Sequence, residues 1–448
     1  MRTVVTKFGG TSLADAGQFR KVKAILDADP DRRIVVASAP GKRFSEDIKV
    51  TDMLIKCYKK AAAGHDYEEV LNDIRARFEE IVKELELDFS LDEHFEYIRQ
   101  RLNGRPNREF MESRGEYLNS QILAAYLGFT FVDPEWCVCF NEDGSFDAEL
   151  TSRTLGAALK PLKQAVVAGF YGADRRGNIR TFSRGGSDIT GSLCAQAIDA
   201  DIYENWTDVS GLLAADPRIV ERPRSVDFLT YRELRTLSYM GASVLHSDAV
   251  LPVSKKGIPI NIRNTNRPED EGTMIVKRLP SDRERAVITG VTGKTGLSVL
   301  QVEKVMVSDE AGFTAVLLDI LKSRKIPFEQ CLTGIDTVSL VIRSDIFNDN
   351  RVVLLDEIKR TLKPDLLSVK ENLSMIAVVG EAENGYKNAT VKIVQAVTDA
   401  GIEISTINQG AGELNLLIGV AEDKYKDAIQ AIYSSISKHG NSRVRVLE

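Results

Sequence analysis

The feature that most constrains the fold is a repeat in the C-terminal part of the chain. Residues of one segment match residues of a second segment at a constant offset, which is the offset between Leu297 and Leu373. Each copy predicts a strand, a helix, two strands joined by a turn, and a further helix. A unit this small buries enough apolar surface only by packing against a neighbour, so the repeat must be recognised before any motif is interpreted. Other matched pairs are Leu317 with Ile393, Gly334 with Gly410, Leu340 with Leu416, and Ile342 with Ile418.

Two βαββαβ units of the ferredoxin-like type are the simplest fold for this repeat. They resemble ACT domains, which typically bind amino acids where paired units meet. We expect the first unit, with a linker strand, at residues 287–368 and the second at residues 369–448. The sequence leaves open whether the units are consecutive or one is inserted in the other.

The N-terminal part predicts a larger domain over residues 1–280. A β-branched run at Thr3–Phe8, a glycine turn, a helical segment and a second buried-type strand at Ile34–Ala37 favour a parallel sheet. Residues 43–127 predict partly exposed helices over this sheet. The expected fold is an α/β domain with three αβα layers. Further buried-type strands are expected at residues 165–170, 202–206 and 258–262.

Composition excludes several classes of function. The chain has 448 residues, a net charge of -6 and scattered basic residues, so it has no electrostatic footprint for nucleic acid. Five cysteines without a spaced Cys/His cluster fit free thiols in a reducing compartment. The N-terminus has no signal-peptide pattern, and the sequence has no apolar run of about 18 residues. We therefore expect a cytoplasmic protein with neither a nucleic-acid nor a membrane partner.

The first chemical motif is KFGGTS at Lys7–Ser12, where the first strand turns into a helix. Paired glycines let backbone N–H groups approach an anion, the helix N-terminus favours negative charge, and a lysine at the strand end adds a cation. The motif therefore predicts a phosphate site, with Thr11 and Ser12 as possible N-caps of the helix. A plain turn with an exposed lysine explains the hexapeptide alone equally well.

The second motif is SRGGSD at Ser183–Asp188, before another segment that predicts a helix. Arginine binds a carboxylate through two charged hydrogen bonds, and the paired glycines keep the backbone open beside Arg184. The local sequence leaves two roles for Asp188, which either caps the helix or faces the reaction centre.

A third signal combines WTDVSG at Trp206–Gly211 with DPR at Asp216–Arg218. These residues follow a predicted strand, at the edge where ligands gather in an open α/β sheet. They predict a nucleotide contact, although a structural turn accounts for them equally well.

Three other segments have ordinary explanations. The charges of Glu112–Leu118 predict a solvated helix face, and Thr51 predicts a helix cap. The run Thr292–Gly296 looks like the end of a Walker A loop, but Ile288 stands where the first glycine is required. We expect a turn between strands there.

Taken in order, the motifs make the chain resemble the aspartate kinases of the amino acid kinase superfamily. The likeness runs from residue 3 through the second repeat and rests on KFGGTS, SRGEYL, GFYG with RGGSD, WTDV with DPR, and INQGAGELN. It implies a phosphotransferase with a carboxyl group as acceptor, which uses ATP to convert L-aspartate to 4-phospho-L-aspartate. This is the first step toward lysine, threonine and methionine, and the ACT units imply feedback regulation.

Carried over position by position, the resemblance implies roles for the motif residues. Lys7 and Asp188 are the expected catalytic residues. The expected contacts to aspartate are Thr51, Glu116 at the amino group, Arg184 at the α-carboxylate, and Ser187. The expected contacts to ATP are Lys7, Gly9, Gly10, Thr11, Ser12, Thr207, Asp208, Asp216, Pro217, Arg218 and Arg267.

The resemblance also implies a cofactor, effectors and an assembly. The cofactor is ATP with Mg2+, the metal being held mainly by the phosphates, with no metal site of the protein's own. Lysine, threonine or both are the implied effectors, at pockets where ACT units pair in a homodimer or a larger homo-oligomer. The expected effector contacts lie in a loop before a helix and in a turn between strands, at Ser308, Asp309, Gly312, Phe313, Gln409, Glu413 and Asn415.

Other functions stay open at this point. A kinase acting on glutamate or N-acetylglutamate would share the fold, but an acetylated substrate has no cationic amine for Glu116. A catalytically silent amino-acid sensor would also keep the fold, although Lys7, Arg184 and Asp188 argue against it. The repeats alternatively serve only to join subunits. A fused homoserine dehydrogenase is not expected, because the length leaves no room for a dinucleotide-binding domain.

Overall fold

The structure, a computed structural model, describes residues 2–183, 185–242, 245–280, 288–305, 312–380, 389–410 and 414–437. The chain forms two compact units. No helix within the described ranges has the length and apolar character needed to cross a membrane. The first unit comprises Met1–Leu212, Ser225–Ser238 and Ser243–Ser281, and the second comprises Leu213–Arg224, Tyr239–Ala242 and Asp282–Glu448.

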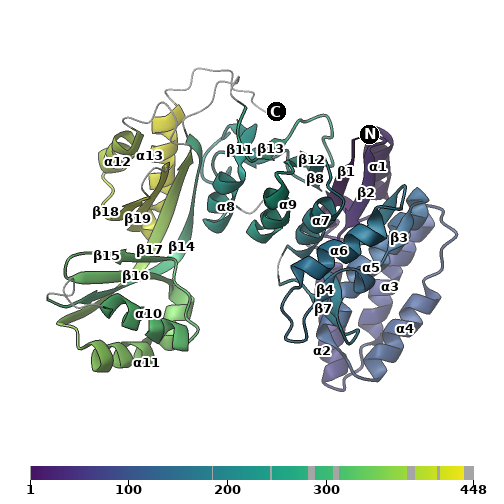
Figure 1. The fold of residues 1–448 in the computed structure, drawn as a ribbon, viewed down its shortest axis with the longest axis horizontal. Helices are drawn as coiled ribbons and strands as arrows, with labels where there is room; N and C mark the ends of the chain where they lie inside the picture. Colours follow the sequence, from purple (N-terminus) through teal and green to yellow (C-terminus); the bar gives the residue numbers. More distant parts are fainter. Residues whose placement is uncertain are drawn as a thin grey trace. The chain divides into compact units, whose positions relative to one another are not determined.

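An eight-stranded sheet forms the centre of the first unit, in the order β11-β13-β12-β8-β1-β2-β5-β3 (Figure 1). Neighbouring strands are parallel, except that β12 and β13 are antiparallel to each other. The expected parallel sheet is therefore confirmed. The strands are β1 (Val4–Phe8), β2 (Arg32–Ala37), β3 (Thr130–Val132), β5 (Ala165–Ala168), β8 (Ile202–Thr207), β11 (Phe228–Thr230), β12 (Ile260–Asn264) and β13 (Thr273–Val276).

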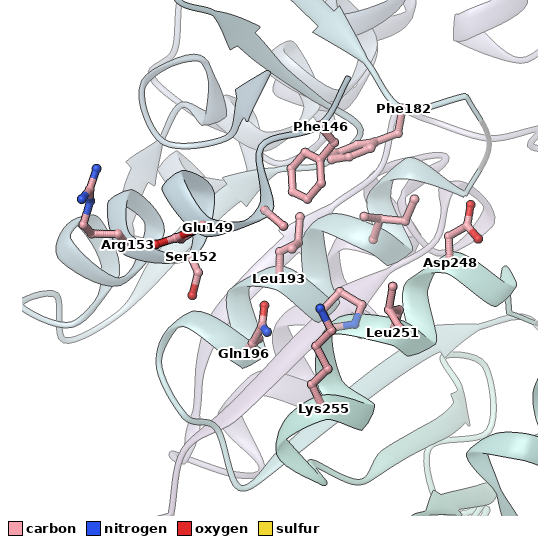
Figure 2. A pocket seen from close by; sticks show the side chains of 13 residues that line it. Phe146, Glu149, Ser152, Arg153, Phe182, Leu193, Gln196, Asp248, Leu251 and Lys255 are labelled. Carbon is pink, nitrogen blue, oxygen red and sulfur yellow. The ribbon is translucent and has the colours of Figure 1, made fainter. Parts of the chain in front are cut away.

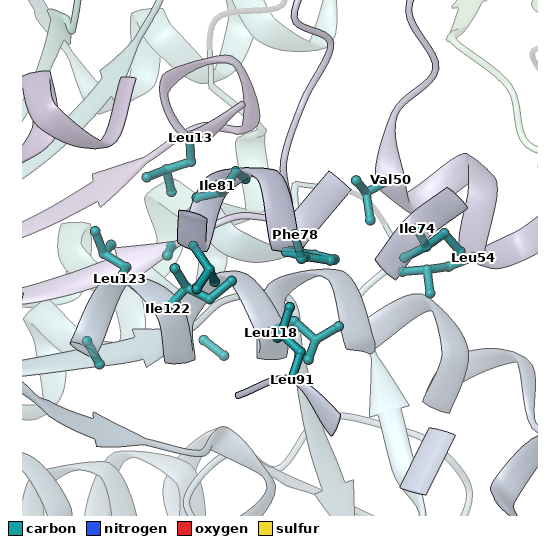
Figure 3. Close-up of a cluster of buried hydrophobic side chains, with 14 of the residues drawn as sticks. Leu13, Val50, Leu54, Ile74, Phe78, Ile81, Leu91, Leu118, Ile122 and Leu123 are labelled. Atoms are coloured by element: carbon teal, nitrogen blue, oxygen red, sulfur yellow. The ribbon is translucent and has the colours of Figure 1, made fainter. Parts of the chain in front are cut away.

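Helices cover both faces of this sheet, which confirms the expected αβα layers. Because side chains alternate along a strand, Phe8 joins the apolar cluster of α1 to α5 on one face, while Lys7 points to the other face and meets α7. Figure 3 shows part of this cluster, with Phe78 of α3 and Leu118 of α5. The helices are α1 (Ala16–Asp27), α2 (Val50–Ala62), α3 (Glu68–Glu84), α4 (Asp92–Asn103), α5 (Arg108–Leu127), α6 (Ala148–Leu159), α7 (Gly186–Ala197), α8 (Tyr231–Tyr239) and α9 (Val250–Lys256).

The chain also contains several short elements. One three-stranded sheet has the order β4-β6-β7. These elements are η1 (Gly10–Leu13), η2 (Pro134–Trp136), β4 (Cys139–Phe140), β6 (Tyr171–Asp174), β7 (Ile179–Thr181), β9 (Leu212–Leu213), β10 (Ser225–Val226) and η3 (Ser247–Ala249).

Helix α1 begins later than the sequence predicts. The glycine turn first forms the 3-10 helix η1, in which the Ser12 N–H donates to the Gly9 carbonyl at 3.0 Å. The N-cap of α1 is Asp15, whose carboxylate accepts the Gln18 N–H at 2.9 Å. The prediction that Thr11 or Ser12 caps the helix is therefore wrong.

The second unit contains a six-stranded antiparallel sheet in the order β15-β16-β14-β17-β19-β18. Its helices α10 and α12 begin at equivalent positions of the sequence repeat and also end at equivalent positions. This confirms the duplication and the ferredoxin-like pattern. The elements are β14 (Ile288–Glu303), α10 (Phe313–Ser323), β15 (Gln330–Thr333), β16 (Thr337–Arg343), α11 (Ser344–Leu362), β17 (Leu366–Gly380), α12 (Ala389–Asp399), β18 (Ile404–Gln409), β19 (Leu414–Ala421), η4 (Glu422–Lys424) and α13 (Tyr425–Ser437).

The two modules share the long strands β14 and β17. Residues 288–294 of β14 pair with residues 375–380 of β17 and belong to the core of the second module. Residues 297–303 pair with β16 and with residues 366–373, and belong to the core of the first module. The first module is therefore inserted after the opening strand of the second, and the expected boundary at residues 368 and 369 falls inside β17.

This sharing also explains one wrong prediction. The run Thr292–Gly296, expected as a turn, lies inside β14. The pairing with β17 shifts register between Lys294 and Leu297, where Gly296 has a φ of 70°. The glycines belong to an irregularity within a long strand.

Candidate active site

Several of the predicted motifs, among them the glycine turn after β1 and the segment after β8, lie at the carboxyl ends of five neighbouring parallel strands, β12-β8-β1-β2-β5. Backbone hydrogen bonds join these ends, for example from the Gly9 N–H to the Trp206 carbonyl at 3.0 Å. In an open sheet of this type, ligands bind beyond the carboxyl edge. The residues at or just past this edge are Gly9, Ser38, Gly169, Thr207 and Asn264.

Lys7 is fixed near this edge by contacts from two elements. It lies on β1 opposite Asn205 of β8. Its Nζ is 2.6 Å from Asp188 Oδ1, and Asn205 Nδ2 donates to the same oxygen at 2.9 Å. The Lys7 and Asp188 side chains are only 10% and 15% exposed. The ammonium is therefore held at one point instead of moving freely in solvent.

The glycine turn passes directly beside this ammonium. A Cβ on Gly9 would lie 3.6 Å from Lys7 Nζ, and one on Gly10 would lie 2.9 Å from the Ala39 carbonyl oxygen. A side chain at Gly10 would therefore push the turn away from β2. Ser12 is buried and shares a hydrogen bond of 2.7 Å with Thr265 Oγ1, while Thr11 is exposed.

Asp188 is not the cap of α7. The N-cap is Gly185, with a φ of 59° that glycine adopts without strain, and Asp188 lies in the first turn with its carboxylate on Lys7. Ser187 is buried against Gly169, where a Cβ would lie 2.6 Å from Ser187 Cβ. Arg184, the expected partner of the α-carboxylate, lies outside the described residues.

Glu116 lies in the buried part of α5. The expectation of a solvated face at Glu112–Leu118 is wrong, since Glu116 is 6% exposed and most of its neighbours on α5 are also buried. Burial raises the pKa of the Glu116 carboxyl to about 8, although it accepts a hydrogen bond from the backbone of Ala39. Its Oε2 has no hydrogen-bond partner among the described residues. A neutral acid at this position gains its charge when a cation arrives.

The segment after β2, residues 38–41, connects Glu116 to the glycine turn. Ala39 contacts Glu116, and the Gly41 N–H donates to the Gly10 carbonyl at 2.7 Å. Beyond a loop, Thr51 stands in the first turn of α2, whose N-cap is Lys49, so Thr51 is not the helix cap. The structure thus links the expected phosphate turn and the expected amine site through one short segment.

Arg77 of α3 holds this segment from behind. Its buried guanidinium donates to the Gly41 carbonyl and, at 2.5 Å, to the Ile48 carbonyl. It also lies 3.0 Å from Asp47, whose pKa is held well below its usual range by the hydrogen bond from Arg43. The sequence alone did not identify Arg77, because its partners are backbone atoms of a distant loop.

We expect Arg77→Lys, which keeps the charge and loses the planar fork of donors, to lower kcat/KM for the reaction at this edge by about tenfold. The physical reason is that Gly41 and the glycine turn are no longer held together. Hydrogen exchange should become faster at residues 41–50 and stay unchanged in the C-terminal sheet. The matched control is Arg75→Ala, which removes a partly exposed arginine of the same helix that pairs with Glu79 and Asp92. Unchanged kinetics in a folded Arg77→Lys variant would contradict this role.

The expected nucleotide contacts fall into two groups. Thr207 ends β8 and Asp208 follows it, and the Thr265 N–H of the loop after β12 donates to the Thr207 carbonyl at 2.8 Å. In the same loop, Arg267 is 3.2 Å from Asp270. The second group, Asp216, Pro217 and Arg218, belongs to the second unit, so its contact with ATP stays a prediction.

The expected effector residues are only partly described. Ser308, Asp309 and Glu413 lie outside the described residues. Gly312 is the N-cap of α10, and Phe313 is buried in the core of the first module. Gln409 ends β18, where its side chain accepts from Thr390 at 3.1 Å, and Asn415 lies in β19. Their contact with an effector stays a prediction.

A cavity of about 660 Å³ lies elsewhere in the first unit, between α6, α7 and α9 (Figure 2). Its lining includes Phe146, Phe182 and Leu193. None of the predicted site residues lines it, so it is distinct from the site that the motifs indicate.

Comparison with known families gives two matches. The amino acid kinase family matches residues 2–264, and the ACT domain matches residues 376–436. The first match covers the strands that carry the motifs, and the second covers the C-terminal module.

Curated relatives and solved structures agree with these matches. Aspartokinase 3 of Bacillus subtilis is 35% identical over 96% of this chain and 97% of its own length. The crystal structure of Clostridium acetobutylicum aspartate kinase is 40% identical, with a TM-score of 0.85 over 97% of this chain and 100% of that one. Escherichia coli aspartokinase III, solved with aspartate and ADP, is 22% identical with a TM-score of 0.79 over 97% of this chain and 100% of that one. Its complex with lysine and aspartate has a TM-score of 0.74 at 23% identity, over 97% of this chain and 99% of that one.

Proposed function

The chain belongs to the aspartate kinases of the amino acid kinase family, and we propose that it transfers the γ-phosphoryl group of ATP to the β-carboxylate of L-aspartate. The products are 4-phospho-L-aspartate and ADP, and the reaction is the first step of the route from aspartate to lysine, threonine and methionine. Aspartate and ADP are the ligands of the similar Escherichia coli enzyme.

The observation that carries this proposal is the fixed position of Lys7 beside the glycine turn, with its Nζ 2.6 Å from Asp188. The attacking β-carboxylate is already ionised at neutral pH, so the reaction needs no general base. Catalysis must come from positioning and from neutralising the charge spread over the transferred phosphoryl group. Lys7 supplies a cation for that charge, while Gly9 and Gly10, which have no side chains, let the phosphoryl group approach the backbone of the same turn.

Aspartate is proposed to lie between this turn and α5. Glu116 binds its ammonium, Arg184 its α-carboxylate, and Thr51 and Ser187 are further contacts. Asp188 organises the charges around Lys7. The contacts to ATP are Gly9, Gly10, Thr11, Ser12, Thr207, Asp208, Asp216, Pro217, Arg218 and Arg267, together with Lys7.

Mg2+ is proposed to bind with ATP, where it would neutralise phosphate charge. Among the described residues, no group of three His, Cys, Asp or Glu side chains gathers as metal ligands. Mg2+ generally prefers phosphate oxygens and water, with few protein ligands.

The test is an assay of ADP release with aspartate, glutamate and N-acetylglutamate as acceptors, in the presence of MgATP. We expect turnover with aspartate and none with glutamate or N-acetylglutamate. Turnover with glutamate or N-acetylglutamate and none with aspartate would transfer the assignment to another amino acid kinase. Absence of turnover with all three would favour a sensor without catalysis.

Regulation by lysine, threonine or both is proposed to act through the ACT modules, in a cytoplasmic homodimer or larger homo-oligomer. The support is the ACT match, the lysine complex of the similar Escherichia coli enzyme, and five free cysteines, which suit a reducing compartment. An effector inhibits only if it binds a low-activity state more tightly than the active state.

Asp309 is proposed to meet the effector's amine, and Glu413 to line the effector turn of the second module. We expect Asp309→Ala or Glu413→Ala, in the full chain, to raise the effector concentration for half-inhibition by about tenfold, according to which module senses the ligand. Inhibition curves with lysine, threonine and their mixture measure this, with Asp345→Ala as an exposed control in the same unit. The full chain is required, because Ala215 and Val220 pack in the core of the second module and a cut near residue 285 would uncover them. If saturating lysine, threonine and their mixture do not inhibit the intact enzyme, the regulatory proposal is wrong and the modules have a structural role.

A further inference from the structure

Two buried polar side chains lie together on the face of α5 that meets the end of β2. Glu116 and Asn119 are three residues apart, so they are neighbours on the helix surface. They are 6% and 0% exposed. Both reach the same segment, since the backbone of Ala39 donates to Glu116 and Asn119 Nδ2 donates to the Ser38 carbonyl at 2.7 Å.

Each of these side chains keeps one buried oxygen without a donor. Glu116 Oε2 and Asn119 Oδ1 have no hydrogen-bond partner among the described residues. The bond to Ser38 sets the orientation of the Asn119 amide, because a flipped amide would bring two carbonyl oxygens together. Buried acceptors are normally satisfied, so these two oxygens indicate that a donor binds between them.

Ser120 is also buried without a partner, but the inference differs for a hydroxyl. A hydroxyl rotates and can donate to the preceding turn of its own helix. The Asn119 amide oxygen can only accept, and so can the Glu116 oxygens once an arriving cation has ionised the carboxyl. The missing group must therefore bring several N–H or O–H donors, and the neighbouring carboxylate favours a cation.

We propose that Asn119 is a substrate-binding residue whose Oδ1 accepts an N–H of the substrate's ammonium, beside the carboxylate of Glu116. This rests on the proposed function, in which the ligand is aspartate. A primary ammonium has three N–H donors and no acceptor, so it can serve both oxygens at once. Asn119 thereby selects amino acids over dicarboxylates without an amine, and its Nδ2 keeps the Ser38 segment in place.

The test compares two ligands that differ only at the amine. Aspartate and succinate share both carboxylates, and succinate lacks the ammonium. We expect Asn119→Leu, which keeps the volume and removes the acceptor, to weaken aspartate binding by roughly tenfold or more while changing succinate inhibition much less. Binding of aspartate is measured by calorimetry and that of succinate by its inhibition constant.

A second variant separates loss of the acceptor from loss of the contact with Ser38. Asn119→Asp keeps an acceptor toward the ligand but places an oxygen against the Ser38 carbonyl, so both ligands should bind more weakly while the preference for aspartate over succinate survives. The control is Ser120→Ala, which removes the neighbouring buried hydroxyl of α5 that makes no hydrogen bond to another described residue. It should leave the preference unchanged.

Equal losses for both ligands in Asn119→Leu would overturn the proposal and leave Asn119 as a support for Ser38. Unchanged aspartate affinity would overturn it as well. A wild-type enzyme that does not bind aspartate would instead refute the proposed function, a result obtained before any variant is compared.

Discussion

Replacing Lys7 with Met is expected to lower kcat by roughly 100-fold and to change the affinity for aspartate little. Met keeps the length of the side chain and removes the cation. The transferred phosphoryl group then lacks the charge that Lys7 holds beside Gly9. An interaction that strengthens only in the transition state affects kcat far more than substrate binding.

The ion pair with Asp188 requires a control, because Lys7→Met leaves a largely buried carboxylate without its cation. The double variant Lys7→Met with Asp188→Asn removes both charges. We expect it to recover thermal stability and to remain inactive. Lys294→Ala, which breaks a half-buried pair with Glu329 in the second unit, reports the general effect of losing such a pair. If the kcat of Lys7→Met is within about threefold of the wild-type value, Lys7 does not bind the transferred phosphoryl group.

Local patterns were sufficient to predict the glycine turn and the strands around it. Thr3–Phe8 is largely β-branched, and the glycines follow at once, so the strand and the turn could be predicted together, while the phosphate site stays a prediction. The repeat likewise predicted both C-terminal modules. It could not reveal that β14 serves both of them, because equivalent strands in a duplicated sequence can exchange places without changing the pattern.

The buried face of α5 was the main failure. Its polar residues imitate a solvated helix, since a site for a charged ligand buries the same side chains that a surface exposes. One signal was present. Gly115 lies in mid-helix, where a Cβ would be 2.7 Å from Ala39 Cβ, and a glycine in a helix often marks close packing. Arg77 and Asn119 gave no such signal, because both bind backbone carbonyls that are distant in sequence.

The pKa of Glu116 predicts how aspartate binding depends on pH. In the empty site the carboxyl titrates at about 8, so at lower pH it is neutral and must release a proton when the substrate's ammonium binds. The KM for aspartate should therefore fall by up to about tenfold per pH unit as the pH rises toward 8, and then level off. Calorimetry in buffers of different ionisation enthalpy should detect the released proton.

Glu116→Gln removes this ionisation. It tests both the binding of the substrate's ammonium by Glu116 and the pH dependence of the KM for aspartate. At pH 8 we expect its KM for aspartate to be roughly 100-fold higher, since a buried ammonium loses its partner, and its pH dependence to flatten. ATP affinity should be almost unchanged.

The stability of the empty enzyme gives an independent check on the direction of the Glu116 pKa shift. The pKa of this carboxyl rises from 4.5 to about 8 on folding. The free energy of unfolding of the wild type should therefore decrease as the pH is raised from 4.5 to about 8. Glu116→Gln should lack that decrease, and an identical pH profile of stability in both proteins would show that Glu116 is ionised in the empty site.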